Sequence, residues 1–349
     1  MKIAIDTSPL HNANSTRGVG MYTKQLLEGL SNIKDNNEYL QVKSAQELQK
    51  LHPDLIHYPF FDLFFRSLPE KQNIPVVVTV HDVTPLVLPE LFPPGLKGKI
   101  KLYFQKKNLQ KVDKIITDSE CSKRDIVRYL NIPIEKIETV YLAADQIYKR
   151  EENKDKRESI KNKYNLPEKY VLKVGDINKH KNFHTLFDAM TRTAPDIHLV
   201  LVGKALDKNA PRIPELLQIE DDIQNFSLQK RVHRLGFVPT DEMPALYTLA
   251  KATVLNSLYE GFGLPALESM MCMTPVIAAD AGSIPEIVGT SGMLINPRDA
   301  DNTASAIDHV FSLDADIYAS LQNKSYEQST KFSLKKMTQE TIDVYESLK

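Results

Sequence analysis

Short apolar runs rich in valine and isoleucine alternate with segments of helical periodicity along almost the whole chain of 349 residues. This alternation is typical of parallel sheets whose strands are joined by crossover helices. In the first half, the runs predict strands at Lys2–Asp6, Leu55–Tyr58, Val76–His81, Lys114–Thr117 and Ile137–Leu142. In the second half, they predict strands at Tyr170–Val174, His198–Val202, Val232–Phe237, Ala252–Leu255, Pro275–Ala278 and Gly292–Ile295.

A break in the pattern separates the two sets of strands. Apolar residues almost vanish across Lys149–Lys169, which we interpret as a linker running into a short charged helix. The chain length also suits two domains of ordinary size. We therefore predict an α/β protein with two Rossmann-like, doubly wound domains, residues 1–148 and 149–332, facing a central cleft. A helical pattern within residues 333–349 could pack back on the first domain.

Composition is that of a globular protein, with 42% hydrophobic residues, 26% charged residues and a net charge of -1. No apolar run approaches the roughly 18 residues of a membrane-spanning helix, and Met1–Asp6 has the pattern of a strand instead of a signal peptide. We therefore expect a cytoplasmic protein. Cys121 and Cys272 lack the spacing of a disulfide framework or a zinc site, and no basic groove suggests nucleic acid as a partner.

One stretch, SLYEGFGLPALES at Ser257–Ser269, has the features of an anion site. A proline suits the first helical turn, so Pro265 predicts a helix that begins around Leu264. Gly261 and Gly263 then form a loop whose backbone N–H groups, together with the helix dipole, face one anionic group.

Two glutamates bracket this glycine loop. We place Glu268 in the first helical turn, where a diphosphate would repel it but the vicinal hydroxyls of a ribose would suit it. Glu260 is left facing the cleft, where a sugar would sit. Alternatively, Glu268 is a first-turn partner of the helix dipole and Glu260 an exposed loop residue, although this does not explain the glycines.

Two other segments follow strands in the first half. Gly18 and Gly20 precede an amphipathic helix, where they could admit an anion or simply form a tight turn, and the turn is the simpler interpretation of this feature alone. His81 and Asp82 end a very apolar strand. The histidine could bond a sugar hydroxyl, or the pair could cap the loop backbone, and both interpretations stay open.

The second half adds one cationic cluster and two acidic triplets. Lys179, His180 and Lys181 follow a strand and could counter a phosphate charge, or form a solvated cluster. The triplets Asp299–Asp301 and Asp314–Asp316 each precede a helical pattern, so N-capping explains them better than metal binding. We predict no catalytic metal.

The segments YEGFGLPALESM and TPVIAADAGSIPEIVG closely resemble the signature of the retaining glycosyltransferases of family 4, which share the two-domain GT-B architecture. The similarity covers nearly the whole chain in the same order, including RGVGMYTKQLL, VVVTVHDVTPL, IITDSECSKRDIVRYLNIP and VHRLGFVPTDEMPALYTLAKA. The histidine–aspartate pair and the Lys-Asn pair in YVLKVGDINKHKNFHTLFDAM most resemble the mannosyltransferase-like branch, whose usual donor is GDP-mannose.

The resemblance implies a role for each matching residue. It places His81 and Glu260 beside the donor sugar, Glu268 on the ribose, and Lys181 on the diphosphate. The donor-binding set that it implies is Gly18, Gly20, Lys181, Phe237, Val238, Gly261, Phe262, Gly263, Leu264 and Glu268. In this set, Gly18 and Gly20 would close over the phosphates, and Phe237 with Val238 would frame the base.

Two departures from the family pattern affect this site. Asp176 stands where members often have an arginine, and either Lys179 or His180 could supply the missing positive charge. Met273 stands where members commonly have a glycine. If that position needs a positive φ, a methionine costs about 1 to 2 kcal/mol, so we expect the turn to be rearranged.

The resemblance implies transfer of a hexose, mannose being favoured, from a nucleoside diphosphate sugar to a hydroxyl of a saccharide or a lipid-linked acceptor, with retention of configuration. It favours GDP-mannose over UDP-sugars and implies no further cofactor. A nucleotide-sugar 2-epimerase of the same fold and a catalytically silent binding subunit remain as alternatives.

A basic segment in the first half suggests a second kind of partner. Leu96–Lys114 holds seven lysines and one aspartate, with Leu102, Tyr103, Phe104 and Leu109 interleaved. Such a helix suits reversible peripheral binding to an anionic membrane surface on its cytoplasmic face. A core-facing helix with a solvated basic back is the alternative.

Overall fold

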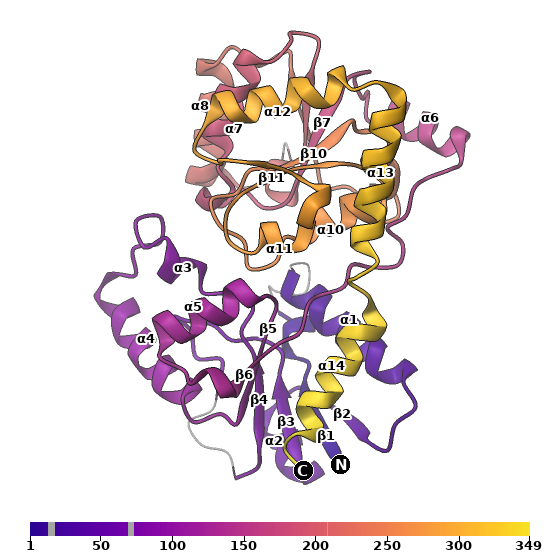
Figure 1. Ribbon diagram of the computed structural model, residues 1–349. Helices are drawn as coiled ribbons and strands as arrows, with labels where there is room; N and C mark the ends of the chain where they lie inside the picture. The colour runs from indigo at the N-terminus through magenta and orange to yellow at the C-terminus, as the bar shows by residue number, and fades with distance from the viewer. Residues whose placement is uncertain (13–17, 69–72, 208) are drawn as a thin grey trace. The chain divides into compact units, whose positions relative to one another are not determined.

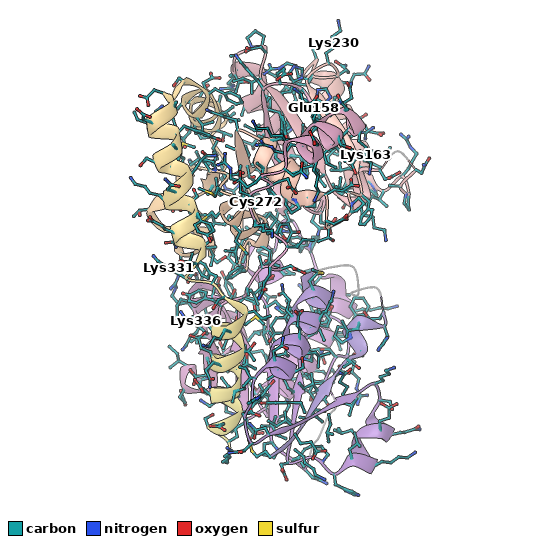
Figure 2. The ribbon with its side chains drawn as sticks, turned by 90° about the vertical axis from the view of Figure 1, so that its right-hand side faces the viewer. Glu158, Lys163, Lys230, Cys272, Lys331 and Lys336 are labelled. Carbon is teal, nitrogen blue, oxygen red and sulfur yellow. The ribbon has the colours of Figure 1, made fainter. Side chains whose placement is uncertain are left out.

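The computed structural model describes residues 1–12, 18–68, 73–207 and 209–349. The chain forms two compact units, which are Met1–Ala143 with Phe332–Lys349, and Ala144–Lys331 (Figure 1). The sequence analysis put the boundary after residue 148, five residues later. Part of the expected linker, α6 (Lys154–Lys163), packs on α9 (Met243–Leu249) in the second unit, and Lys163 Nζ lies 2.6 Å from Glu242 Oε1. Figure 2 labels Glu158 and Lys163, which both belong to α6.

The first unit contains a parallel six-stranded sheet in the order β2-β1-β3-β4-β5-β6. Its strands are β1 (Lys2–Asp6), β2 (Glu38–Val42), β3 (Leu55–Tyr58), β4 (Val76–Thr79), β5 (Lys114–Thr117) and β6 (Ile137–Thr139). Its helices are α1 (Gly18–Asn32), α2 (Ala45–Leu51), α3 (Thr84–Val87), α4 (Gly95–Leu109), α5 (Glu120–Leu130) and α14 (Leu334–Glu346). The apolar runs therefore predicted five of these six strands, including edge strand β6, although β4 and β6 end earlier than expected.

Strand β2 was missed by the sequence analysis. It pairs in parallel with β1, from Lys2 opposite Glu38 to Asp6 opposite Val42, and lies at the edge of the sheet. Val42 is its one fully buried residue. The other four residues of this edge strand are exposed or half-buried, so it lacks the continuous apolar run of a parallel strand that is buried on both faces.

The second unit contains a parallel sheet in the order β12-β11-β10-β7-β8-β9. Its strands are β7 (Tyr170–Val174), β8 (His198–Val202), β9 (Val232–Gly236), β10 (Ala252–Leu255), β11 (Val276–Ala279) and β12 (Met293–Ile295). Its other helices are α7 (Phe183–Arg192), α8 (Pro214–Asn225), α10 (Leu264–Met271), α11 (Ile284–Val288), α12 (Ala300–Ser312) and α13 (Ala315–Ser329). Read from β9, the strands come in the order third, second, first, fourth, fifth and sixth along this unit, which is the strand order of dinucleotide-binding folds. The direction in which strands are added to the sheet reverses between β7 and β10.

Helix α14 belongs to the first unit although it ends the chain. It lies beside α1, where a Cβ on Gly29 would come within 2.0 Å of Thr338 Oγ1 (Figure 1). Tyr345 is fully buried, and its hydroxyl lies 2.6 Å from His57 Nδ1. The close approach at Gly29 and this buried hydrogen bond anchor α14 to the sheet.

Candidate active site

The strand order of the second unit reverses between β7 and β10, and the loops after these two strands lie next to each other. Asn182, which precedes α7, donates from Nδ2 to the carbonyl of Asn256 at 3.1 Å. Asn256 returns the bond, since its Nδ2 donates to the carbonyl of Asn182 at 2.9 Å. This reciprocal pair fixes the two loops to each other at the edge where parallel sheets bind ligands.

Each of these loops contributes one charged side chain to an ion pair. Lys181 Nζ lies 2.7 Å from Oε1 and 2.9 Å from Oε2 of Glu260. The side chains are 16% and 10% exposed. Burial alone would raise the pKa of Glu260, but the charges of Lys181 and His180 lower it below its usual value. Glu260 is therefore an ionised carboxylate at neutral pH, and it is not the exposed loop residue of the alternative interpretation.

The loop after Glu260 is shaped by two glycines. Helix α10 begins at Leu264, as predicted, and the capping residue Gly263 has φ 97°, a left-handed conformation that favours glycine. Gly282, in the loop after β11, has φ 60°, and a Cβ there would lie 2.7 Å from the carbonyl oxygen of Glu260. Ser283 donates to that oxygen from N at 3.1 Å and from Oγ at 2.9 Å. The loop that carries Glu260 is thus held from two sides.

Glu268 lies in the second turn of α10, and not in the first turn as the sequence analysis placed it. It accepts a hydrogen bond from Tyr247 Oη at 2.6 Å and another from Tyr148. Burial raises its pKa, and these two phenols only partly offset this effect. The dipole-partner alternative is wrong, because the residue is one turn too far along the helix. Glu268 is therefore anchored among tyrosines, whereas Glu260 lies among cations.

A buried lysine that was not predicted from the sequence lies near enough to the ion pair to interact with both of its charges. Lys173, in β7, is 3% exposed, and its Nζ donates to Asn256 Oδ1 at 2.8 Å and lies 5.0 Å from the ring centroid of Phe183. Burial and the charge of Lys181 lower the pKa of Lys173 to about 7. A lysine within a strand that is otherwise buried was the signal that could have revealed it.

The structure shows the contacts of Asp176, which stands where family members often have an arginine. Asp176 is exposed and turned back into its own loop, accepting from the backbone N of Ile177 at 2.8 Å and from Asn178 Nδ2 at 3.1 Å. Of the two residues left open as its substitute, Lys179 is exposed, whereas His180 lowers the pKa of Glu260. His180 therefore adds to the positive field at Glu260.

The expectation of a rearranged turn at Met273 is wrong. Met273 has φ 58°, the left-handed conformation that a glycine would adopt without strain. Its backbone N–H donates to the carbonyl of Met270 at 3.0 Å, and the N–H of Thr274 donates to the carbonyl of Ser269 at 2.9 Å. These two bonds form a Schellman motif at the end of α10, and the motif persists because its carbonyls need partners.

His81, in the first unit, follows β4 and is bonded at both ring nitrogens. Nδ1 lies 2.8 Å from Asp118 Oδ2, and Nε2 lies 3.2 Å from the carbonyl of Pro59. Burial alone would lower the pKa of His81, but Asp118 reverses the effect and raises it. Asp82 caps the loop instead, accepting from Thr84 N at 2.7 Å. An oxygen acceptor at each ring nitrogen and the raised pKa both favour the protonated form of His81, which is half-buried. Its partner Asp118, which follows β5, was not predicted from the sequence.

The other predicted residues are less closely grouped. Gly18 and Gly20 lie in the first turn of α1 and not in a loop before it, while Arg17 of the same segment lies outside the described residues. Phe237, just after β9, is 62% exposed, whereas Val238 is 5% exposed. Phe237 thus presents a ring that is open to stacking.

The capping interpretation of the two acidic triplets is confirmed. Asp299 accepts from Asn302 N at 3.0 Å to cap α12, and Asp314 accepts from Ile317 N at 2.9 Å to cap α13. Across the described residues, no group of three or more His, Cys, Asp or Glu is arranged to hold a metal ion. In the same part of the chain, no helix is long and apolar enough to cross a membrane.

Comparison with known protein families accounts for this arrangement. Residues 154–330, just over half of the chain, match the model of the family described as glycosyl transferases group 1. The chain belongs to this family. Residues 34–146 match the model described as Glycosyltransferase Family 4. The protein is therefore a glycosyltransferase, and the family predicted from its signature segments is confirmed.

Relatives and solved structures agree with this assignment. The chain is 29% identical over 294 residues to O-antigen chain mannosyltransferase B of Escherichia coli, covering 78% of this chain and 70% of that protein. It is 26% identical over 317 residues to the serotype-specific mannosyltransferase WbdA of Escherichia coli, of which it spans 38%. The structure of Anabaena HepE in complex with UDP and glucose matches with a TM-score of 0.78 and 20% identity over 100% of both chains. The fold of this glycosyltransferase is GT-B, as predicted.

Proposed function

We propose that this glycosyltransferase transfers a mannosyl group from a nucleoside diphosphate sugar, GDP-mannose in preference to UDP-sugars, to a hydroxyl of a saccharide or lipid-linked acceptor. Two Escherichia coli relatives are named as mannosyltransferases, which supports the choice of sugar. Anabaena HepE, which has the same fold, forms a complex with UDP and glucose, and this supports a nucleotide-sugar donor as the general class. We place this reaction in the cytoplasm.

The observation that carries the proposal is the pair of Lys181 and Glu260 at the reversal of strand order, beside the start of α10. An α-helix leaves its first N–H groups without partners inside the helix, and its dipole favours an anion there. In α10, Pro265 has no N–H and the N–H of Ala266 donates to the carbonyl of Gly263 at 2.9 Å, so a diphosphate at this edge would meet the N–H of Leu264, the helix dipole and Lys181. The sugar would then lie against Glu260.

The chemistry follows from where charge develops. The bond between the sugar C1 and the phosphate oxygen breaks, a bond from C1 to the acceptor oxygen forms on the same face, and the acceptor proton passes to the departing diphosphate. Configuration is thereby retained. Lys181 and the positive end of the α10 dipole stabilise the growing negative charge of the leaving group, which is an electrostatic contribution to catalysis. This route needs no pair of carboxylates at glycosidase spacing and no metal.

The remaining residues have supporting roles in the proposal. Glu268, held by Tyr247, would accept from the ribose hydroxyls. Phe237 would stack on the base. From the first unit, His81 would present its positive charge to the donor sugar, and Gly18 with Gly20 would bring the start of α1 to the phosphates.

The test is a donor panel with mass spectrometry of the products. The full chain is incubated with GDP-mannose, GDP-glucose, UDP-glucose or UDP-galactose and a mixture of mannosyl saccharides and polyprenyl-linked saccharides. We expect an acceptor mass gain of one hexose that is fastest with GDP-mannose, and a nuclear magnetic resonance spectrum showing the anomeric configuration of the donor. Isomerised donor without any product would contradict transfer, and an inverted product would contradict retention.

A further inference from the structure

Helix α4 carries apolar side chains on two faces. The inner face packs on the unit through Gln105 and Leu109, which are 4% and 0% exposed, and through half-buried Leu102. The outer face presents Leu96 (82% exposed), Ile100 (59%), Tyr103 (54%) and Phe104 (58%). Their spacing of i, i+4, i+7 and i+8 places these four residues on one stripe of the helix.

This outer stripe does not fit the alternative of a core-facing helix with a solvated basic back. That alternative predicts polar residues outside, whereas the outside holds large apolar ones. Phe65, 66% exposed, adds to the same surface, since Lys101 Nζ lies 4.8 Å from its ring centroid. In the described part of the chain, no other helix carries more than two exposed large apolar residues.

The charge around the outer stripe has a single sign. Helix α4 contains no aspartate or glutamate, and its exposed lysines are Lys97, Lys99, Lys101 and Lys107, followed by Lys111. A hollow of about 430 Å³ beside Phe104 is lined by four cationic side chains, Arg66, Lys101, Lys107 and Lys111. Apolar stripe and cationic hollow lie on the same surface, because Phe104 borders both.

We propose that the outer face of α4 is a docking surface for an anionic lipid bilayer. Leu96, Ile100, Tyr103 and Phe104 enter the boundary between headgroups and acyl chains, and the lysines contact lipid phosphates. The composition decides between a bilayer and a protein partner. Lysine is depleted in the cores of protein interfaces, whereas lysines flanking an aromatic and aliphatic stripe are typical of helices that lie in a membrane interface. Long lysine stems can reach the phosphates while the apolar residues insert.

The chain contains no tryptophan, so a single introduced indole reports on one surface position. Phe104→Trp places it on the outer stripe, and the control Tyr326→Trp places it on α13, at a residue that is 47% exposed. Both full-length variants are titrated with vesicles of phosphatidylcholine, alone or mixed with phosphatidylglycerol. We expect a blue shift of emission and quenching by brominated acyl chains for Phe104→Trp with the anionic vesicles, reversed by salt, and neither effect for Tyr326→Trp.

A second set of variants separates charge from apolar contact. In the Phe104→Trp background, Lys97→Ser with Lys107→Ser is expected to weaken binding to anionic vesicles roughly fivefold for each lysine removed. The matched control removes two exposed lysines elsewhere, Lys324→Ser with Lys335→Ser, and leaves binding unchanged. Circular dichroism of each variant shows that the fold is retained.

The outcomes are distinct. Equal shifts with neutral and anionic vesicles, or no shift with either, overturn the proposal. A blue shift of Phe104→Trp that appears without lipid and grows with protein concentration also overturns it, because the surface would then bind a second copy of the chain. The proposal does not rest on the sugar or the donor, since vesicle binding is measured without either.

Discussion

Lys173 is a buried base whose charge changes near neutral pH. Burial and Lys181 lower its pKa to about 7, whereas a lysine in an unfolded chain has a pKa of about 10.4. Between these two values the unfolded chain binds more protons than the folded one, so the free energy of unfolding rises with pH across this window.

Replacing this lysine should therefore remove a pH dependence. We expect the free energy of unfolding of Lys173→Met, minus that of the wild type, to be larger near pH 7 than near pH 9. The reason is that only the wild type gains about 1.4 kcal/mol for each pH unit in this window. Urea unfolding of both proteins at the two pH values measures the difference. If the difference in free energy of unfolding between the two proteins were the same at both pH values, Lys173 would titrate in its ordinary range.

Met273 occupies a position that favours glycine, with φ 58°. Met273→Gly should raise the free energy of unfolding by a few tenths to about 1 kcal/mol, since relief of left-handed strain outweighs the added freedom of the unfolded chain. Urea unfolding midpoints of the two proteins provide the measurement. A loss of stability would show that the half-buried methionine side chain contributes more than the strain costs.

Glu268 is held by the hydroxyl of Tyr247 at 2.6 Å, which makes a separate test of the ribose role possible. Glu268→Ala should weaken binding of GDP by roughly 1.5 to 3 kcal/mol for each charge-assisted bond lost. Tyr247→Phe keeps the carboxylate and its bond from Tyr148 but removes one of its two anchors, so we expect a smaller loss. Calorimetry with GDP compares them, and full affinity in Glu268→Ala would end the ribose assignment.

At the scale of elements, the loop after β11 positions the loop after β10. A Cβ on Gly282 would meet the backbone of Glu260 at 2.7 Å, and Ser283 Oγ donates to the same residue. We therefore expect Gly282→Ala to lower kcat strongly, and Ser283→Ala to lower it less, because the serine keeps its backbone bond. Equal activity of Gly282→Ala and wild type in the transfer assay would contradict this positioning role.

The elements also show how far the sequence could predict the structure. Inner strands such as β7 and β10 were predicted with correct bounds, because strands buried on both faces need continuous apolar runs. Edge strand β2 was missed because it lacks such a run. The left-handed turn at Met273 and the second apolar stripe of α4 could not be predicted either. The turn at Met273 depends on which carbonyls at the end of α10 need hydrogen-bond partners. The outer stripe of α4 depends on which face of that helix meets the core.

The site was predictable to a similar degree. The glycines and the proline fixed the start of α10 at Leu264, since their backbone preferences are local. By contrast, the partners of His81, Glu268 and Lys173 come from segments distant in sequence, and no local pattern identifies Asp118, Tyr247 or Asn256 as those partners.

At the scale of the whole molecule, two Rossmann-like units make up a GT-B glycosyltransferase, and α14 returns the end of the chain to the first unit. The proposed mechanism depends above all on Lys181, which binds and stabilises the departing diphosphate at the switch point of the second unit. A matched control exists on the same segment. Lys169 precedes β7, at the end of the strand opposite to the end that leads to Lys181, and its exposed side chain pairs with Asp196.

The decisive measurement is the steady-state rate of hexose transfer from GDP-mannose by the wild type, Lys181→Met and Lys169→Met. We expect Lys181→Met to lose at least about tenfold in kcat and also to bind GDP more weakly, because the negative charge of the leaving group grows in the transition state. Lys169→Met should match the wild type, and EDTA should leave the wild-type rate unchanged. A Lys181→Met enzyme with normal kcat, or a wild-type rate abolished by EDTA, would contradict this mechanism.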